Sequence, residues 1–423
     1  MDEVTTGPLA GVRVVDFSRV LSGPIVGRML ADLGADVVKV EPPEGDLTRF
    51  ADPKVNSISL YFTQQNVGKR NVSVDLAHPD GAAAARRLVA SADVVLENFR
   101  PGVMARFGLD YATVATANPR VVYASITGYG QTGPWADRRA YAVVVHAEAG
   151  LIEGGARWRS DAAGAPSPMV QDGMSHADVY AGLSCASGIL AALFARERTG
   201  RGDHVEVAMA DAMVFVNDFA HWDHAPPHAT GASWPALAPV YSPIVHTADG
   251  AAVVIAGDPA ARGVFERYCD AMERADLRDD PRFAAADARR SRRAELLAIV
   301  ADWAATMPGA APLLTRLDAA GLANGAVRSV ADLLDTEWAR DRGVLVAVPD
   351  RGDGTVPVVQ SPLRFAGATT GATGHAAYRG EHNREVLREV GYSDDEVAHL
   401  EAVGALSSRV PDPVRHATEA SGS

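Results

Sequence analysis

The residues with the clearest chemical potential lie in SHADVYAG, where a long stretch of small and apolar residues begins. Asp178 follows Ser175 by three positions, which is the spacing of a capping box at a helix N-terminus. The free backbone N–H groups and the positive end of the helix dipole would favour the ionised form of the Asp178 carboxylate there. A capping role and a chemical role are compatible, so both readings stand. Asp172, six residues upstream, is the other carboxylate in this segment that could have a chemical role.

Several common enzyme motifs are absent from the chain. The segment after the first predicted strand reads SRVLSGP instead of G-x-G-x-x-G, so it lacks the glycine turn that a dinucleotide pyrophosphate needs, although Glu41 stands where a ribose-binding acid would. The chain also has no G-x-x-x-x-G-K-S/T loop, no H-E-x-x-H and no G-x-S-x-G. These absences argue against nicotinamide and flavin enzymes, P-loop NTPases, zinc proteases and α/β-hydrolases.

The composition is that of a globular protein, with 47% hydrophobic and 22% charged residues among 423. A formal net charge of −13 gives little support to binding of nucleic acid or of a membrane surface. The two cysteines, Cys185 and Cys269, form no disulfide framework and no metal-ligand pattern, so we expect no metal site. No signal-peptide pattern opens the sequence, and the apolar stretch 182–195 is too short to span a bilayer. We therefore expect a cytoplasmic protein.

Lysine occurs only at Lys39, Lys54 and Lys69, whereas arginine and alanine are abundant. We interpret this bias as the codon usage of a GC-rich bacterial genome, without functional weight.

The first 130 residues alternate β-branched runs with helical patterns, as βαβ units on a parallel sheet do. The sheet's last strand in this region is followed by GYGQTGP, a loop at a carboxyl end, where open α/β sheets bind ligands. Residues 157–167 predict a polar loop, and 175–198 a long helix rich in small residues, which is suited to close packing on its own sheet or on a partner subunit. The predicted strands are 12–17, 37–41, 72–76, 94–97, 121–126 and 204–209, and the predicted helices before residue 100 are 23–33 and 79–92.

Near residue 221 the composition changes to a segment with proline and tryptophan and without helical or strand periodicity. Such a segment indicates a linker or a substrate loop. We therefore divide the chain into a large Rossmann-like domain at 1–225, a smaller α/β domain at 226–335, and a segment at 336–423 that returns to the large domain. The tail ATEASGS is expected to be disordered. Further predicted elements are a strand at 251–256, helices at 262–272, 289–307 and 311–320, a strand at 358–365, and helices at 381–390 and 394–403.

In five places the chain resembles the family III CoA-transferases, the CaiB/BaiF family that includes formyl-CoA and carnitine CoA-transferases. The segments are PLAGVRVVDFSRVLSGP with LADLGADVVKVEPPEGD, VSVDL with ADVVLENFRPGVMARFGLDY, NPRVVYASITGYGQTGP, ASGILAALFARERTGRG, and GEHNREVLREVGYSDDEVAHL. They occur in the family's order and span nearly the whole chain. The resemblance implies the family's α/β fold, a Rossmann-like parallel sheet with a smaller α/β domain, and a homodimer of two interlocked subunits.

The resemblance also implies the activity, transfer of coenzyme A from an acyl-CoA thioester to a free carboxylic acid. The family's nucleophile is an aspartate shortly before the RERTGRG-like segment, and counting back ten residues from Gly188 places it at Asp178. Its carboxylate would attack the thioester carbonyl to give a mixed anhydride, which the expelled CoA thiolate reopens as an aspartyl-CoA thioester. The acceptor acid then repeats these steps in reverse. The CoA thioester is a substrate, and no covalently bound cofactor is expected.

The resemblance places CoA at the carboxyl edge of the sheet. Arginine can fork onto its phosphate oxygens, while backbone N–H groups and Phe99 would serve the adenine and the pantetheine. Each of these arginines, taken singly, reads more readily as a solvated surface charge, and it is their co-location at strand ends that favours a binding role. The implied CoA-binding residues are Val20, Leu21, Val74, Asp75, Leu76, Ala77, Asn98, Phe99, Arg100, Arg106, Arg139 and Tyr141.

Three positions depart from the family's pattern. Ala77 stands where lysine is frequent, which weakens one expected phosphate contact. Ala142 stands where an acid is frequent, and His146 where many transferases have glutamine. On the apolar run VVVHAEAG, His146 is interpreted as a satisfied core or interface histidine, with a catalytic role as the alternative.

Two other functions compete with CoA transfer. α-Methylacyl-CoA racemase shares the fold and needs an acid–base pair on both faces of the α-carbon. The His-Asp pair of that branch falls on Tyr141-Ala142 here, which favours the transferase, although His146 or His176 could substitute. A CoA-binding protein without catalysis is the third reading, and the intact Asp178 argues against it. Trp222 and Trp234 hint at a bulky acyl group, and loop packing explains them equally well.

Overall fold

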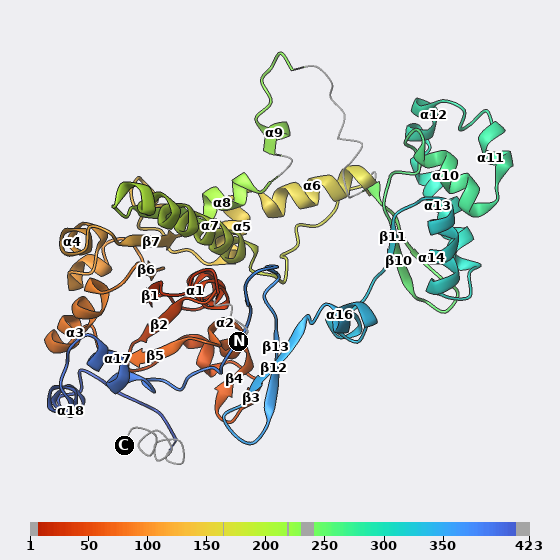
Figure 1. The fold of residues 1–423 in the computed structure, drawn as a ribbon. Coiled ribbons are helices and arrows are strands. Elements are labelled where there is room, and N and C mark those ends of the chain that lie inside the picture. Colours follow the sequence, from red (N-terminus) through yellow and green to blue (C-terminus); the bar gives the residue numbers. More distant parts are fainter. Residues whose placement is uncertain (1–6, 164, 218–219, 230–240, 412–423) are drawn as a thin grey trace. The chain divides into compact units, whose positions relative to one another are not determined.

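A computed structural model describes residues 7–163, 165–217, 220–229 and 241–411 of the chain. They form two compact units (Figure 1). The first unit draws on Met1–Leu151, Asp172–Ala220 and Glu337–Ser423, and the second on Ile152–Gln171 and His221–Thr336.

The first unit is built on a six-stranded sheet in the order β5-β2-β1-β6-β7-β8, in which every neighbouring pair is parallel. The chain adds strands outward from β1 in one direction and then from β6 in the other. The strand order therefore reverses between β1 and β6, which is the switch point where open α/β sheets bind ligands. The strands are β1 (Arg13–Asp16), β2 (Asp36–Glu41), β5 (Arg70–Ser73), β6 (Val94–Glu97), β7 (Val122–Thr127) and β8 (His204–Ala208).

Helices cover both faces of this sheet, which explains why its strands read as nearly continuous hydrophobic runs. On one face, Val14 of β1 belongs to a core cluster with residues of α1, α5, α7 and α8. On the other face, Val15 belongs to a cluster with residues of α3, α4, α17 and α18. The helices are α1 (Ser22–Asp32), α3 (Pro79–Ala90), α4 (Tyr111–Ala117), α5 (Ala142–Glu148), α7 (His176–Thr199), α8 (Met209–Phe215), α17 (Asn383–Glu389) and α18 (Asp394–Ala402).

The small residues of α7 serve close packing inside this unit. A Cβ placed on Gly182 would lie 2.9 Å from the carbonyl oxygen of Ser22 in α1, and one placed on Gly188 would lie 2.6 Å from Val205 of β8. Of the two predicted packing partners, the helix therefore uses its own unit along this face. By length and composition α7 is also apolar enough to cross a membrane, but its buried residues belong to the sheet's core cluster.

Smaller elements complete the first unit. The C-terminal segment returns to this unit, where Leu406 bridges to Val74 just after β5. These elements are β3 (Lys54–Val55), β4 (Ile58–Ser59), α2 (Leu60–Asn66), β12 (Leu345–Pro349), β13 (Thr355–Val359), α16 (Glu337–Asp341) and the 3-10 turns η1 (Leu47–Phe50) and η2 (Met104–Phe107).

The second unit has its own core around Val253, Phe265, Leu296 and Leu313. Its three-stranded antiparallel sheet has the order β11-β10-β9. The elements are β9 (Ile244–His246), β10 (Ala252–Ile255), β11 (Asn324–Ala326), α10 (Val264–Met272), α11 (Ala275–Asp279), α12 (Ala286–Ser291), α13 (Arg293–Ala305), α14 (Ala310–Ala319) and α15 (Val330–Leu334), together with α9 (Ala220–Asp223) and nearly all of α6 (Leu151–Ala163).

Three predicted elements are wrong in detail. The expected loop at 157–167 is helical as far as Ala163, because no proline or glycine interrupts the chain between Ala156 and that residue. The expected helix at 289–307 is divided at Arg292. The expected strand at 358–365 ends at Val359, before Pro362, which has no N–H for a ladder. The side chain of Trp222, all of Trp234 and the tail lie outside the described residues.

Candidate active site

Asp178 lies in the first turn of α7, as the sequence predicts. Ser175 occupies the N-cap position, but its side chain makes no capping hydrogen bond. The expected capping-box bond from Ser175 is therefore wrong, and a residue from another helix caps α7.

The residue that caps α7 is His146, which projects from α5. The backbone N–H of Ala177 donates to His146 Nε2 at 3.2 Å, and the imidazole is fully buried. A nitrogen that accepts a hydrogen bond carries no proton, so the ring is neutral in this arrangement. Burial lowers the pKa of His146, and the neighbouring His176 lowers it further, which favours the same neutral state. This is the geometry of a satisfied core histidine, and it caps α7 one residue before Asp178.

The carboxyl group of Asp178 is half-buried and faces Ser22, the first residue of α1. Burial raises the pKa of Asp178, while hydrogen bonds from the hydroxyl and the backbone N–H of Ser22 act in the opposite direction. We expected the helix start to favour the ionised form, but desolvation outweighs the donors. The result is a more basic carboxylate, which is a stronger nucleophile once ionised. Burial raises the pKa of Tyr61 in α2, and the charge of Asp178 raises it further.

Asn98, at the end of β6, ties Ser22 to the loop that follows β1. Its Nδ2 donates to Ser22 Oγ at 3.0 Å and to the carbonyl oxygen of Arg19 at 2.8 Å, and its Oδ1 accepts from Arg19 N at 2.8 Å. The Ser22 hydroxyl accepts from Asn98 and keeps its proton for Asp178. The Asn98 amide thus joins the loop after β6 to the segment between β1 and α1, on the two sides of the switch point.

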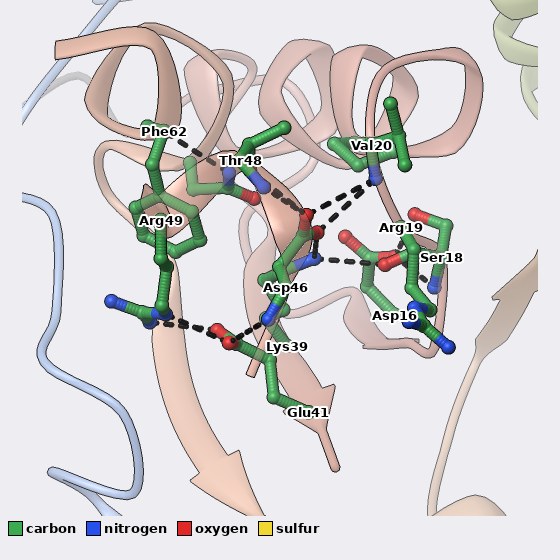
Figure 2. A network of polar contacts seen from close by, with 12 residues as sticks. Asp16, Ser18, Arg19, Val20, Lys39, Glu41, Asp46, Thr48, Arg49 and Phe62 are labelled. Carbon is green, nitrogen blue, oxygen red and sulfur yellow. Dashed lines mark hydrogen bonds and ion pairs between the residues drawn. The ribbon is translucent and has the colours of Figure 1, made fainter. Parts of the chain in front are cut away.

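The loop after β1 is strained and held from below by a buried carboxylate (Figure 2). Val20 has φ of 67°, which is rare for a β-branched residue. Its N–H donates to the Asp46 carboxylate at 3.2 and 3.3 Å, and Lys39 Nζ lies 3.1 Å from Asp46 Oδ2 and donates to the Ser18 carbonyl at 2.8 Å. The Lys39 charge, together with hydrogen bonds from Thr48, lowers the pKa of Asp46 to about 2 against the effect of burial. Asp46 therefore stays charged and holds the strained turn.

A second buried pair holds the other end of the same loop. Lys69 Nζ donates to Asp16 Oδ2, to Asn66 Oδ1 and, at the start of α1, to the Pro24 carbonyl oxygen, at 2.9, 3.0 and 2.9 Å. Burial lowers the pKa of Lys69 to about 8, against the raising effect of Asp16. The structure thus gives Lys39 and Lys69 a structural role that their scarcity in the sequence did not reveal.

The residues expected to bind CoA after β1 and β6 are brought together, because Asn98 links both loops, while the turn after β5 lies at the same edge beyond β2. In that turn Val74 is buried in the core, so only its backbone can face a ligand. Asp75 Oδ1 accepts from Ala77 N, and Leu76 packs against the core. Leu21 is buried beside Val20.

The remaining expected residues lie farther along the same edge. Arg100 donates to the carbonyl oxygen of Asp137, and Arg106 lies over the Phe107 ring. Arg139 and Tyr141 are exposed between β7 and α5. Within the described residues, none of these four hydrogen-bonds to or ion-pairs with Asp178, so their role in binding CoA stays a prediction.

Sequence reasoning missed Glu97, a buried carboxyl group at the end of β6. Glu97 accepts from Phe99 N at 2.8 Å and lies 3.5 Å from Gln131 Nε2, so it connects the loop after β6 with the glycine-rich loop after β7. Burial raises the pKa of Glu97 to about 7, and hydrogen bonds from Ser125, Phe99 and Gln131 only partly oppose this shift. Its place in ENFR, at a strand end, is the only sequence signal for this role.

An open parallel sheet with a carboxylate beside its switch point defines an α/β enzyme of the ligand-binding, doubly wound class. Residues 9–383 match the CoA-transferase family III. The chain is 34% identical over 398 residues to succinate–glutarate CoA-transferase of Agrobacterium fabrum, covering 90% of this chain and 96% of that protein. It is 32% identical over 427 residues to formyl-CoA:oxalate CoA-transferase of Streptomyces avermitilis, covering 95% and 100%.

A solved structure is similar over the same span. The crystal structure of a CAIB/BAIF family protein from Brucella suis matches with a TM-score of 0.76 and 33% identity, covering 91% of this chain and 100% of that chain. The chain therefore belongs to CoA-transferase family III and is a CoA-transferase, with the α/β fold that the sequence predicts. CoA thioesters are the substrates of such enzymes.

Proposed function

We propose that this enzyme transfers coenzyme A from an acyl-CoA thioester to a free carboxylic acid through covalent acylation of Asp178. The observation that carries the proposal is the carboxylate itself. It is half-buried at the start of α7, raised in pKa by desolvation, and approached by two donors from Ser22 beside the switch point. An ionised carboxylate in such surroundings is poorly solvated and therefore reactive.

Each step of the proposed cycle balances. Asp178 attacks the thioester carbonyl, the C–S bond breaks, and a mixed anhydride and CoA thiolate form. The thiolate then attacks the aspartyl carbonyl of the anhydride and releases the first acid as its carboxylate. The acceptor carboxylate attacks the aspartyl-CoA thioester and expels the thiolate, which attacks the acceptor's carbonyl and regenerates Asp178.

We infer that the acceptor acid is a short dicarboxylate. The relatives named above act, by their names, on succinate and glutarate and on oxalate, and another, from Haloarcula hispanica, is a succinyl-CoA:mesaconate CoA-transferase, 35% identical over 399 residues. A panel of dicarboxylic and monocarboxylic acceptors with succinyl-CoA as donor checks this inference. Preference for monocarboxylic or aromatic acids would contradict it.

The test of the nucleophile is trapping. Incubation with an acyl-CoA and hydroxylamine is expected to convert Asp178 into its hydroxamate, detected by mass spectrometry of the peptide, and Asp178→Asn is expected to lose at least about 10³-fold in transfer rate. Asp172→Asn, which changes an exposed carboxylate in the same segment, is the matched control and keeps both signals.

Deuterium uptake at the acyl α-carbon without any acceptor acid, together with no adduct on Asp178, would instead identify a racemase. Binding of CoA with neither exchange nor adduct would identify a non-catalytic binder.

We further propose that the enzyme is a cytoplasmic homodimer of interlocked subunits. Support comes from the large apolar side chains that the first unit leaves exposed on α7, on α8 and just beyond α8. They are Leu183, Phe194, Val214, Phe215 and Val216, of which Phe215 is 87% exposed. Several large apolar side chains left exposed on two neighbouring helices are typical of a protein interface.

A further inference from the structure

Arg379 carries a buried guanidinium group for which the described residues provide no hydrogen-bond or ion-pair partner. Its residue exposure is 7%, and its Nε and Nη1 atoms make no hydrogen bond. Among the described residues no carboxylate forms an ion pair with it. Burying an uncompensated charge is costly, and native proteins satisfy buried arginines almost without exception.

Arg379 lies at the carboxyl edge of the sheet, among the loops assigned to CoA. A Cβ placed on Gly45, in the loop after β2, would lie 3.5 Å from Arg379 Cδ. The next residue, Gly380, donates to Asn71 Oδ1 of β5 at 2.7 Å, and Arg409 N donates to the Arg379 carbonyl at 2.9 Å. The side chain therefore lies beside the loop after β2, on the side of β5.

The carboxylates near Arg379 do not neutralise it. Glu41 is occupied by Arg49, which donates to it through Nε and Nη2 at 2.7 Å each, and by Asn71. The charges acting on Arg379 are those of Arg409, Glu41, Arg49 and Glu44, in that order, so three arginines share two carboxylates. Three guanidinium groups beside two carboxylates leave an excess of positive charge here, which favours the binding of an anion.

We propose that Arg379, together with the exposed Arg409, binds a phosphate group of coenzyme A at the carboxyl ends of β2 and β5. The proposal rests on the function proposed above. The turn at 74–77 carries no cation of its own, so the C-terminal segment supplies the positive charge at this place. A guanidinium forks onto phosphate oxygens with charge-assisted hydrogen bonds, which offsets the cost of its burial only when the ligand is bound.

The experiment measures binding of free CoA by calorimetry, which does not require acylation of Asp178. Arg379→Leu is expected to raise the Kd for CoA about tenfold or more and to leave the Tm of the ligand-free protein unchanged or higher, because an unpartnered buried charge is removed. Arg409→Leu changes an exposed side chain and is expected to weaken CoA severalfold without affecting the fold. Arg384→Leu, which breaks the exposed ion pair with Glu401, is the matched control with wild-type affinity.

One further ligand, 3′-dephospho-CoA, identifies the phosphate group. If 3′-dephospho-CoA binds the wild type as weakly as CoA binds Arg379→Leu, the site takes the 3′-phosphate. If the variant weakens both ligands equally, the site takes the diphosphate. Both results support the proposal.

Wild-type affinity of Arg379→Leu and Arg409→Leu for CoA would overturn the proposal. So would a lower Tm of the ligand-free variant combined with unchanged CoA affinity, which indicates a purely structural arginine. Stabilisation of the wild type by inorganic phosphate, lost in the variant while CoA affinity is unchanged, would make this a free-anion site. An adduct on Asp178 with unaltered CoA affinity refutes this inference alone, whereas weakened CoA binding without any adduct refutes only the proposed mechanism.

Discussion

At the scale of single residues, the reactivity proposed for Asp178 depends on how its charge is balanced. Burial raises the pKa of the carboxyl group, and two donors from Ser22 oppose that rise. Because the Ser22 hydroxyl also accepts from Asn98, its orientation is set by a residue in the loop that follows β6. The carboxylate is therefore tuned by residues that come from other elements of the first unit.

Ser22→Ala removes one of these donors, so the pKa of Asp178 should rise further. The nucleophile must be ionised, and activity is lost as the pH falls through its pKa. The acid limb of the profile of kcat/KM against pH is therefore expected to move to higher pH in the variant. Ser187→Ala, on the exposed face of the same helix, should leave the limb in place. An unshifted limb in Ser22→Ala would remove Ser22 from the site.

At the scale of elements, the N-terminus of α7 is capped by a residue of α5. His146 Nε2 accepts the N–H of Ala177, whereas Ser175 makes no capping bond. His146→Ala leaves that N–H unsatisfied and should cost at least about 1 kcal/mol of stability and reduce kcat, because Asp178 lies in the same turn. His146→Gln can offer an amide oxygen and should recover most of both. Equal losses in the two variants, measured by urea unfolding and by steady-state kinetics, would contradict the capping role.

The buried Glu97 at the end of β6 makes the stability of the folded protein depend on pH. With a folded-state pKa of about 7 and a usual value of 4.5, Glu97 keeps its proton in the folded state after the unfolded chain has lost it. Its stabilising contribution is complete below about pH 4.5 and is lost as the pH rises through 7, a difference of about 3 kcal/mol. Glu97→Gln is expected to raise the Tm relative to the wild type at pH 8 and to change it little at pH 4.5. An increase of equal size at both pH values would show that the Glu97 charge is not responsible.

At the scale of the whole molecule, the apolar face of α7 and α8 should be covered in solution. Phe215, 87% exposed, and Phe194, 66% exposed, are the largest side chains on it. We expect the wild type to have twice the chain mass by light scattering, and the double variant Phe194→Ser, Phe215→Ser to shift toward the monomer mass. Phe365→Ser, which changes another exposed phenylalanine, is the control that stays dimeric. A monomeric wild type would contradict the proposed assembly.

Much of this fold could be predicted from local patterns. The parallel strands, α1, α3 and α7 follow from β-branched runs and helical periods that a single stretch of chain contains. The loop expected at 157–167 was wrong because its polar residues concealed a helix, and the bond expected from Ser175 was wrong because a capping box is only a spacing. The run without proline or glycine from Ala156 to Ala163 could have corrected the first error, whereas the second required knowing that His146 packs against the start of α7.

The sequence by itself determined the family, the parallel sheet and the place of Asp178 in the first turn of a helix, because each depends on residues that are neighbours in the chain. Only the tertiary structure decided what surrounds that carboxylate. Ser22, His146 and Asn98 come from α1, α5 and β6, and they meet at α7 because strand order brings the loops after β1 and β6 to one edge. The same holds for Lys39, Lys69 and Arg379. Their roles follow from their burial and from neighbours that are distant in the sequence.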